Sequence, residues 1–289
     1  MARKVFLNGD WVDYAQAVVP VEDRGLMFAD GIYEVIRVYN GKVFQLGPHL
    51  DRLFMGAAEL RINLHYRREE LERILARTVE FNGLENGGLY LQVTRGVSPR
   101  GHAFPAASTP TVFALTHEGH GPPARPGDGR PVEGSPAITA PDNRFGLCYV
   151  KTVGLLPNVL ARQQAQEAGA REAILVRDGL VTEASSSNVF AVIGGTLYTH
   201  PLANILPGIT RDIVLRLAAR LGIPVREIAV PIGHLRRADE VFITGTMTEV
   251  EPVVSLDGRP VADGKPGPVT LRLFEAYVGV VEDDCGRVR

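Results

Sequence analysis

The chain has 289 residues, of which 45% are hydrophobic, and its 31 basic and 33 acidic side chains give a formal net charge of -2. This length and composition are typical of one large or two medium domains with a substantial core. The balanced charge gives no electrostatic footprint for nucleic acid, and no basic helix marks a membrane surface. We therefore expect neither nucleic acid nor a membrane as a partner.

Cysteine usage and the start of the chain indicate a compartment. Cys148 and Cys285 are the two cysteines, and they lie far apart in the sequence. Such usage is typical of a reducing cytoplasm rather than of a disulfide framework. The first residues lack the apolar stretch of a signal peptide, and no run approaches the ~18 apolar residues of a membrane span. We expect a soluble cytoplasmic protein.

Two hairpins are predicted near the start of the chain. Asn8-Gly9 and Asn40-Gly41 each separate two apolar runs, and an Asn-Gly pair favours the left-handed backbone of a tight hairpin turn. The expected strands are residues 5–7 and 11–12 in the first hairpin, and 35–39 and 42–44 in the second.

Two helices and two more strands follow. The first helix begins at Pro48, and apolar residues at the spacing i, i+3, i+4, i+7 predict its inward face. These residues are Leu50, Leu53, Phe54 and Ala57. The second helix is expected from about Glu69 to Phe81, with Leu71, Ile74, Leu75 and Val79 inward and Gly83 just past its end as a common stop. Strands are expected over residues 89–94 and 111–115.

The composition changes between Gly119 and Pro136. Residues 119–131 are rich in proline and glycine, which disfavour regular structure. We therefore expect an N-terminal domain of residues 1–120, a linker of residues 121–135 and a C-terminal domain of residues 136–289.

Strands and helices alternate in the C-terminal part. Helices are expected over residues 157–167 and 211–221, each followed closely by a glycine. Apolar strands are expected over residues 173–176, 188–193, 197–198 and 240–244. The polar tail after Glu282 is expected to be disordered.

Glu183 is the most unusual residue of this part. It lies in Val181-Thr-Glu-Ala-Ser-Ser-Ser-Asn-Val-Phe190, between apolar runs with the character of strands. Protein interiors rarely accept a carboxylate without a partner that needs it. The cationic ring nitrogen of a bound cofactor is such a partner, so Glu183 indicates an enzyme of the pyridoxal-phosphate kind.

Lys151 is a second candidate, because it interrupts the apolar run of residues 147–153. Burying an ammonium group costs several kcal/mol and favours the neutral amine, which is the form that makes a Schiff base. The alternative is a lysine on an edge strand whose charged end reaches solvent.

Three loops carry groups suited to anions. Residues 205–212 lead into a helix with Thr210 as the expected N-cap, and the free amides of a helix N-terminus bind phosphate. Residues 244–249 offer hydroxyls and amides after a strand. Arg100 and His102, on a loop rich in glycine and proline, suit a carboxylate. Each loop has an alternative interpretation. Residues 205–212 would then be an ordinary capped helix, residues 244–249 an ordinary turn, and Arg100 and His102 solvated loop charges.

Other motifs in the sequence do not indicate a functional site. His117 and His120 are spaced like metal ligands but have no further ligands nearby, so no metal site is expected. The chain has no glycine-rich dinucleotide loop, no P-loop lysine motif and no nucleophile elbow.

Six segments, in this order, resemble the class IV (fold type IV) aminotransferases, which include D-amino-acid aminotransferases, branched-chain aminotransferases and aminodeoxychorismate lyases. They are Glu22-Asp-Arg-Gly25, Phe28-Ala-Asp-Gly-Ile-Tyr-Glu-Val35, His49-Leu-Asp-Arg-Leu53, Gln92-Val-Thr-Arg-Gly96, Glu183-Ala-Ser-Ser-Ser-Asn-Val-Phe190 and Gly208-Ile-Thr-Arg211. The resemblance spans roughly Val5 to Lys265 and is greatest to the bacterial D-amino-acid enzymes. It implies an α/β (α+β) fold of two domains, the smaller N-terminal and the larger C-terminal, with a mostly antiparallel, barrel-like sheet and helices in the latter.

The resemblance also implies pyridoxal 5'-phosphate as the cofactor and a role for each matched residue. Lys151 matches the lysine that forms the Schiff base, Glu183 the partner of the pyridine nitrogen, and Leu206 a residue lying against the ring. The positions that hold the cofactor phosphate are Arg52, Ile209, Thr210 and Thr246. The substrate-carboxylate trap matches Tyr33, Arg100 and His102. In relatives the loop of the last two reaches in from the neighbouring subunit, so a homodimer is implied.

The implied reaction moves an amino group between a D-amino acid such as D-alanine and a 2-oxo acid such as 2-oxoglutarate, because Arg100-x-His102 marks the D branch of the family. Gly154, Arg37 and Phe145 depart from the D-specific pattern and leave the breadth of substrates open. The alternatives are a branched-chain L-amino-acid aminotransferase, an aminodeoxychorismate lyase and a non-enzymatic small-molecule binder. A pure binder needs neither Lys151 nor Glu183.

Overall fold

The computed structural model describes residues 3–118 and 132–287, and the chain divides into two compact units. Unit 1 comprises Met1–Gly121, Val150–Gly154 and Asp284–Arg289, and unit 2 comprises Pro122–Tyr149 and Leu155–Asp283. The expected linker, residues 121–135, lies mostly outside the described residues. Two segments of the expected domain of residues 136–289 group with unit 1 instead. They are Val150–Gly154, which carries Lys151, and Asp284–Arg289.

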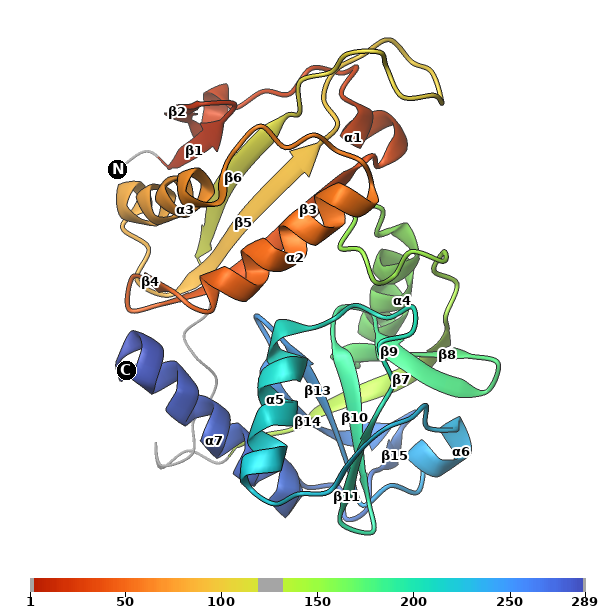
Figure 1. The fold of residues 1–289 in the computed structure, drawn as a ribbon. Helices are drawn as coiled ribbons and strands as arrows, with labels where there is room; N and C mark the ends of the chain where they lie inside the picture. The colour runs from red at the N-terminus through yellow and green to blue at the C-terminus, as the bar shows by residue number, and fades with distance from the viewer. Residues whose placement is uncertain (1–2, 119–131, 288–289) are drawn as a thin grey trace. The chain divides into compact units, whose positions relative to one another are not determined.

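Unit 1 is built on a six-stranded sheet in the order β2-β1-β6-β5-β3-β4 (Figure 1). Its strands are β1 (Lys4–Leu7), β2 (Asp10–Asp13), β3 (Gly31–Tyr39), β4 (Lys42–Val43), β5 (Gly87–Thr94) and β6 (Val112–Glu118). All neighbours pair antiparallel. Both predicted hairpins are confirmed, and Asn8 and Asn40 have φ values of 50° and 49°, the left-handed backbone that such turns require.

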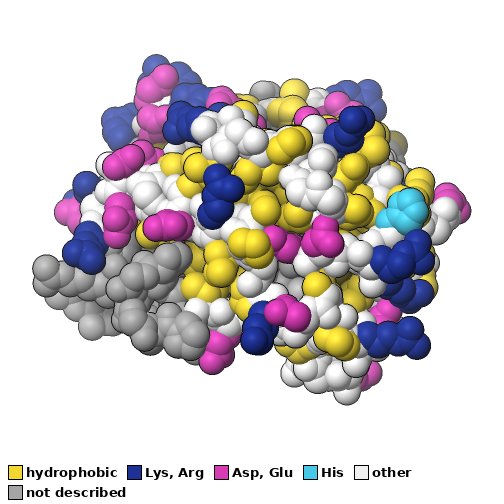
Figure 2. Space-filling view, turned by 90° about the horizontal axis from the view of Figure 1, so that it is seen from below, with side chains coloured by type: hydrophobic (Ala, Val, Ile, Leu, Met, Phe, Trp, Pro, Cys, Tyr) yellow, Lys and Arg dark blue, Asp and Glu magenta, His cyan; other side chains and the backbone are white. Residues whose placement is uncertain are grey.

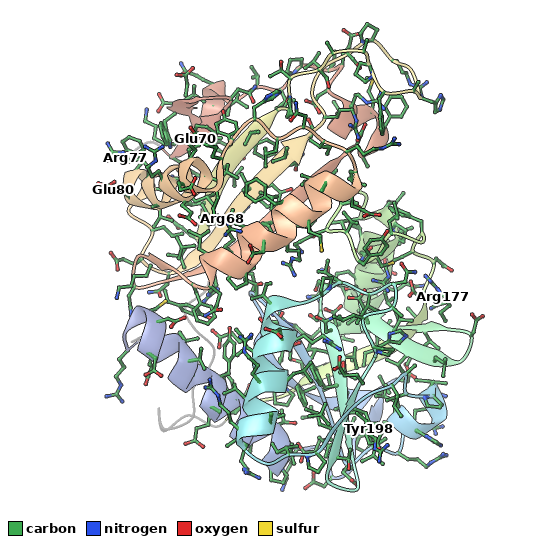
Figure 3. The ribbon with its side chains drawn as sticks, viewed as in Figure 1. Arg68, Glu70, Arg77, Glu80, Arg177 and Tyr198 are labelled. Carbon is green, nitrogen blue, oxygen red and sulfur yellow. The ribbon has the colours of Figure 1, made fainter. Side chains whose placement is uncertain are left out.

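Two helices, α2 (Leu46–Glu59) and α3 (Arg68–Asn82), pack against the sheet (Figure 1). The predicted inward residues of both helices are buried, except that Phe54 is half-buried. Gly83 ends α3 with φ 56°, as predicted. Figure 3 labels Arg77 and Glu80 of α3, which pair at 2.8 Å. The 3-10 helix η1 (Tyr14–Gln16) and the short helix α1 (Arg24–Phe28) complete the unit.

Unit 2 is built on a nine-stranded sheet in the order β12-β11-β10-β13-β14-β7-β8-β9, with β15 paired to β14. Its strands are β7 (Ser135–Pro141), β8 (Glu172–Arg177), β9 (Leu180–Ala184), β10 (Asn188–Ile193), β11 (Thr196–Thr199), β12 (Val225–Glu227), β13 (Glu240–Gly245), β14 (Glu249–Leu256) and β15 (Arg259–Pro260). Most pairs are antiparallel, but β7 is parallel to both its neighbours and β11 is parallel to β12. The edge strand β9 also contacts β10, so the sheet curls as a barrel does.

The helices of unit 2 are α4 (Leu156–Glu167), α5 (Ile209–Arg220), α6 (Ile232–Leu235) and α7 (Pro268–Cys285). Helix α7 continues past Glu282 to Cys285, so the expectation of a disordered tail is wrong for residues 283–285. Buried apolar residues along α7, among them Phe274, Tyr277 and Val281, hold the helix in place up to the buried Cys285. Strands β7, β9, β12, β14 and β15 were not predicted.

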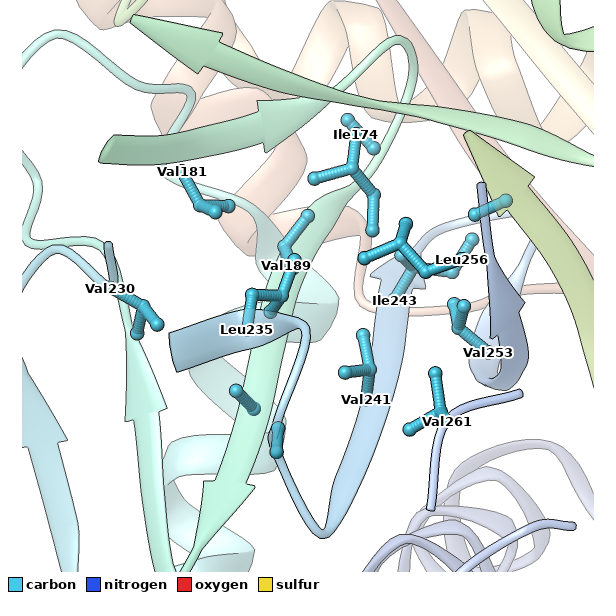
Figure 4. Packing of buried hydrophobic residues seen from close by; sticks show 14 residues of the cluster. Ile174, Val181, Val189, Val230, Leu235, Val241, Ile243, Val253, Leu256 and Val261 are labelled. Carbon is cyan, nitrogen blue, oxygen red and sulfur yellow. The ribbon is translucent and has the colours of Figure 1, made fainter. Parts of the chain in front are cut away.

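The core of the curled sheet is made mainly of β-branched side chains (Figure 4). Val189, Val241, Ile243 and Val253 come from three neighbouring strands, and Leu235 of α6 packs against them. Branched side chains of this kind pack well on a pleated surface.

No helix among the described residues is long and apolar enough to cross a membrane. On the face shown in Figure 2, basic and acidic side chains are interspersed around hydrophobic ones rather than gathered by sign.

Candidate active site

Lys151 lies in an irregular segment that runs beside the beginning of β3. The amide of Tyr33 donates to the carbonyl of Lys151 at 3.0 Å, and the amide of Val153 donates to the carbonyl of Gly31 at 3.1 Å. Lys151 is half-buried, and its Nζ lies 4.3 Å from the centroid of the Tyr33 ring, within the range of a cation–π contact. The segment pairs with β3 through an isolated antiparallel bridge between Ile32 and Thr152, and the Lys151 side chain lies over the Tyr33 ring.

The Tyr33 ring belongs to a row of aromatic side chains on one face of the unit 1 sheet. Tyr33 stacks on Tyr90 with ring centroids 5.6 Å apart, and Tyr90 stacks on Phe113 at 5.9 Å. Burial, followed by the neighbouring Tyr33, raises the pKa of Tyr90 to about 12. Tyr90 therefore stays protonated, and its hydroxyl donates to Gln92 Oε1 at 2.6 Å.

A buried ionic cluster lies on the opposite face of β3. Successive side chains of a strand alternate between faces, so Glu34 points away from Tyr33 and toward α2. Arg52 Nε and Nη2 each donate to the Glu34 carboxylate at 2.8 Å, and His49 Nδ1 lies 2.7 Å from it. The predicted phosphate ligand Arg52 thus has its guanidinium oriented by Glu34, a residue that the sequence did not single out.

The pKa values of this cluster follow from its burial and charges. Burial alone would raise the pKa of Glu34, but the charge and hydrogen bonds of Arg52 and the hydrogen bond of His49 outweigh it and hold the pKa at about 2. Burial lowers the pKa of His49, Glu34 opposes that effect, and the charges of Arg52 and Lys151 reinforce it.

Acid should destabilise the protein through Glu34. Because its folded-state pKa is about 2, below the ordinary 4.5, its contribution is fully present above pH 4.5 and is lost as the pH falls toward 2. The free energy of unfolding in urea, measured between pH 6 and pH 2.5, should fall less steeply for Glu34→Gln, which is also less stable at pH 6. Parallel pH profiles for the two proteins would contradict this assignment.

The predicted carboxylate-binding residues Arg100 and His102 lie elsewhere in unit 1, on the loop after β5. Both side chains are exposed and lie beside Phe28, with Arg100 Cζ 5.1 Å and the His102 ring 5.5 Å from the Phe28 ring centroid. Among the described contacts, no hydrogen bond, ion pair or ring contact joins either of them to Tyr33 or Lys151.

Glu183 is buried in unit 2, near the end of β9. Arg144 Nη1 donates to its Oε1 at 2.5 Å, and Asn188 Nδ2 donates to its Oε2 at 3.2 Å. Burial raises the pKa of Glu183, while the charge and hydrogen bond of Arg144 and the backbone amide of Leu206 oppose the rise. The protein therefore supplies its own cationic partner to this carboxylate, and the sequence did not predict Arg144.

Arg144 is itself fixed by Asp142. Its Nε and Nη2 donate to the two Asp142 oxygens at 2.9 Å each, and Thr182 Oγ1 donates to Asp142 at 2.8 Å. Arg177, labelled in Figure 3, donates to the carbonyl of Arg144 at 2.9 Å. Burial alone would raise the pKa of Asp142, but its hydrogen bonds to Arg144 and Thr182 and the Arg144 charge hold it at about 2. The pKa of Arg144 is raised, so this pair stays charged.

The serines that follow Glu183 bind a second buried carboxylate, Glu172. Ser186 and Ser187 donate to its Oε2 at 2.8 and 3.3 Å, and Ser185 donates to its Oε1. These bonds fix the turn between β9 and β10, and so the relative positions of Glu183 and Asn188.

The N-terminus of α5 lies beside Asn188. Gly208 is the N-cap, so the prediction that Thr210 is the N-cap is wrong, and Thr210 lies buried in the first turn. A Cβ at position 208 would lie 2.0 Å from Asn188 Oδ1, so any side chain there would displace Asn188 from its bonds to Glu183 and Leu206. No side chain among the described residues caps the helix, so its first amides are available to an anion.

Thr244 and Thr246 lie at the end of β13 and in the turn after it. Thr244 pairs in register with Asn188, and its Oγ1 is buried without a hydrogen-bond partner among the described residues. A buried hydroxyl without a partner is costly, which indicates a ligand that accepts from it. Thr246 is half-buried in the turn.

These features fit a cofactor with a phosphate and a cationic ring. The α5 amides and the Thr244 hydroxyl suit the phosphate, and Glu183 suits the ring nitrogen. Leu206 is tied to the same cluster, because Asn188 Nδ2 donates to its carbonyl at 3.0 Å. Unit 2 thus gathers Glu183, Leu206, Ile209 and Thr210 around Asn188, with Thr246 two residues beyond the strand partner of Asn188. Unit 1 brings Lys151 to Tyr33 and carries the Glu34–Arg52 pair on the opposite face of β3.

Residues 31–256 match the model of the amino-transferase class IV family, and the chain belongs to this family of pyridoxal-phosphate enzymes. The predicted family, enzyme class and cofactor are confirmed.

The chain is 47% identical to the D-alanine aminotransferase of Bacillus licheniformis over 274 residues, which covers 94% of this chain and 95% of that protein. It is 43% identical to the D-alanine aminotransferase of Staphylococcus aureus (strain MW2) over 282 residues, covering 97% and 98%.

Three solved structures confirm the predicted fold type. The branched-chain amino acid aminotransferase of Escherichia coli superposes with a TM-score of 0.88 at 30% identity, covering 96% of this chain and 94% of that one. The branched-chain amino acid aminotransferase of Thermoproteus uzoniensis, solved with norvaline, also gives a TM-score of 0.88 at 30% identity, covering 99% and 97%. A further branched-chain enzyme, solved with pyridoxamine 5'-phosphate, gives 0.88 at 32% identity, covering 99% and 96%.

Proposed function

We propose that this aminotransferase moves an amino group between a D-amino acid such as D-alanine and a 2-oxo acid such as 2-oxoglutarate. The observation that carries the proposal is the identity of 42–47% to D-alanine aminotransferases over almost the whole chain. Arg100 and His102, both exposed on one loop and both against the Phe28 ring, supply two donors for a substrate carboxylate and support the same proposal.

The cofactor, when bound, withdraws electrons from the substrate Cα and stores the amino group between the two half-reactions. Lys151 Nζ would hold its aldehyde carbon. Glu183, held by Arg144, would bind the ring nitrogen and favour its protonated form, and Leu206 would lie against the ring. The amides of Ile209 and Thr210 and the side chains of Arg52, Thr210 and Thr246 would bind the phosphate, with the Thr244 hydroxyl as a further donor.

The substrate is bound and deprotonated by unit 1 residues. Arg100, with five N–H donors in a fixed fork, binds the α-carboxylate together with His102 and the Tyr33 hydroxyl. Lys151 Nζ, as a neutral amine, would take the proton from the substrate Cα and hold it for return. The fixed carboxylate determines which Cα bond faces the ring, and so the hand of the substrate.

The working form is a homodimer of the cytoplasm. Leu156, Val159 and Leu160 make an i, i+3, i+4 stripe on α4, and each is more than half exposed in the single chain, at 68%, 57% and 59%. An apolar stripe of this kind is typical of a subunit contact. The loop of Arg100 and His102 serves the neighbouring subunit, as the family resemblance implies. Cys148 and Cys285 are unpaired, in line with a reducing compartment.

A branched-chain L-amino-acid aminotransferase is the second candidate, because the solved structures with a TM-score of 0.88 carry a branched-chain activity in their names. A substrate panel separates the two. D- and L-alanine and D- and L-leucine, each with 2-oxoglutarate, should give turnover with D-alanine well above all L substrates. A clear preference for L-leucine would refute the D assignment, and pyruvate from aminodeoxychorismate without an amino acceptor would favour a lyase.

A further inference from the structure

We propose that Arg24 is a positioning residue that fixes the loop carrying Arg100 and His102 and thereby sets the affinity for the substrate α-carboxylate. The inference rests on the proposed function, because it takes Arg100 and His102 as the groups that bind this carboxylate. It assigns a role to the Glu22-Asp-Arg-Gly25 segment, for which the sequence offered only a resemblance.

Arg24 is the first residue of α1, and its side chain extends to the backbone of the loop that carries Arg100 and His102. Its side chain is only 4% exposed. Its Nη1 donates to the carbonyl of Gly101 at 2.7 Å and to that of Ala103 at 3.4 Å, and its Nη2 donates to the carbonyl of His102 at 3.5 Å. One guanidinium therefore binds three consecutive carbonyls, immediately after Arg100.

The guanidinium is itself anchored to the sheet side of unit 1. Arg24 Nε donates to Asp30 Oδ2 at 2.8 Å, and Arg95 binds both oxygens of the same carboxylate at 2.7 and 2.9 Å. Arg95 also donates to the carbonyls of Leu60 and Arg61 at 2.8 Å each. The position of Arg24 is thus determined by residues at the ends of α2 and β5, and the loop takes its position from Arg24.

Aromatic contacts also link the side chains of the loop to Arg24 and Arg95. The Phe28 ring lies 4.8 Å from Arg24 Cζ and also contacts Arg100 and His102. Farther along, the Phe104 ring lies 3.6 Å from Arg95 Cζ. Because Arg100 and His102 are exposed and lie outside any helix or strand, their directions depend on how the loop backbone is held.

Arg24→Lys and Arg24→Met, prepared with the cofactor bound, test this role. Lysine keeps the charge and the pairing with Asp30 but loses the planar fork. The half-reaction with D-alanine is followed by the change in cofactor absorbance over a range of concentrations. We expect both variants to raise the half-saturating D-alanine concentration by about tenfold or more, as loss of hydrogen bonds from a charged group implies. The limiting rate and the cofactor content should change by less than about threefold.

Arg61→Met is the matched control. Arg61 is exposed, and its Cζ lies 5.0 Å from the ring centroid of Phe104 on the same loop. Arg95 binds the backbone carbonyl of Arg61, and methionine at this position retains that carbonyl. It should leave the D-alanine dependence unchanged within about twofold. If Arg61→Met raised the half-saturating D-alanine concentration as much as Arg24→Lys does, the proposal would be overturned. Any loss of packing at the loop would then explain the weaker binding of D-alanine.

A double-mutant cycle separates positioning from general stability. In a background that carries both Arg100→Ala and His102→Ala, Arg24→Lys should have little further effect on the half-saturating concentration. A full tenfold effect there, or a fall in limiting rate with unchanged D-alanine dependence, would overturn the proposal. If Arg100→Ala and His102→Ala have no effect themselves, the proposed carboxylate site fails. If they have an effect and Arg24→Lys has none, only the role of Arg24 fails.

Discussion

The Lys151→Ala protein should transfer amino groups roughly 10³-fold more slowly than the unaltered chain, since one side chain supplies both the covalent link to the cofactor and the Cα proton transfer. Turnover of D-alanine with 2-oxoglutarate measures the loss. Borohydride reduction of the unaltered protein, followed by peptide mapping, should place the cofactor on Lys151. Lys42→Ala changes an exposed lysine of the same unit and should keep full activity. Label on another lysine would remove the basis for the assigned role.

The same variant tests whether the loop of Arg100 serves the neighbouring subunit. Lys151→Ala chains, which are nearly inactive, and Arg100→Ala chains, assayed at a D-alanine concentration too low for them to turn over appreciably, are unfolded together and refolded. If the active site takes Lys151 from one chain and Arg100 from the other, hybrid dimers hold one intact site, and roughly a quarter of the activity returns. If both residues belong to a site within one chain, the hybrid contains no intact site and the mixture stays inactive.

Glu183→Gln should slow turnover by about 10²-fold, because an amide of the same size cannot keep the cofactor ring nitrogen protonated. The fold should persist, since Arg144 retains its two hydrogen bonds to Asp142. The absorbance of the bound cofactor should shift together with the rate. Glu251→Gln is the control, a partly exposed carboxylate 3.4 Å from Arg171 on the same sheet. Turnover of Glu183→Gln within about twofold of the unaltered protein would contradict the assigned role.

Local chemistry explains which parts of the fold the sequence could predict. The Asn8-Gly9 and Asn40-Gly41 turns and the glycine after α3 act within a few residues, and all three predictions are confirmed. Strand β7, in contrast, pairs with β14 more than a hundred residues later, and nothing near β7 in the sequence signals that partner. The cap of α5 was misassigned because glycine and threonine are both common N-caps. The Asn188 side chain, which would have to move for any side chain at position 208, is close only in the folded chain.

The candidate site shows the same division. Lys151 and Glu183 stand out because a charge interrupts or follows an apolar run. Thr210, Arg100 and His102 were predicted because their loops suit anions. The other predicted residues, which are Tyr33, Arg52, Leu206, Ile209 and Thr246, came from the family resemblance. Their partners Arg144, Glu34 and Arg24 were missed because charged residues are common on surfaces, and their burial appears only on folding. One signal was available: Glu34 falls on the face of β3 opposite Tyr33, where an alternating strand predicts burial.

The composition of unit 1 has a consequence for how the protein is made. Asn40 Nδ2 donates to the carbonyls of Cys285, Gly286 and Arg287 at 3.2 Å each, and β3 binds the segment that carries Lys151. A ribosome adds about 5–20 residues per second, so the last of these pieces emerges on the order of ten seconds after Gly121. Through that interval the nascent unit 1 lacks its C-terminal segment, and early in the interval it also lacks the segment that carries Lys151. It is completed only after nearly all of unit 2 has been synthesised.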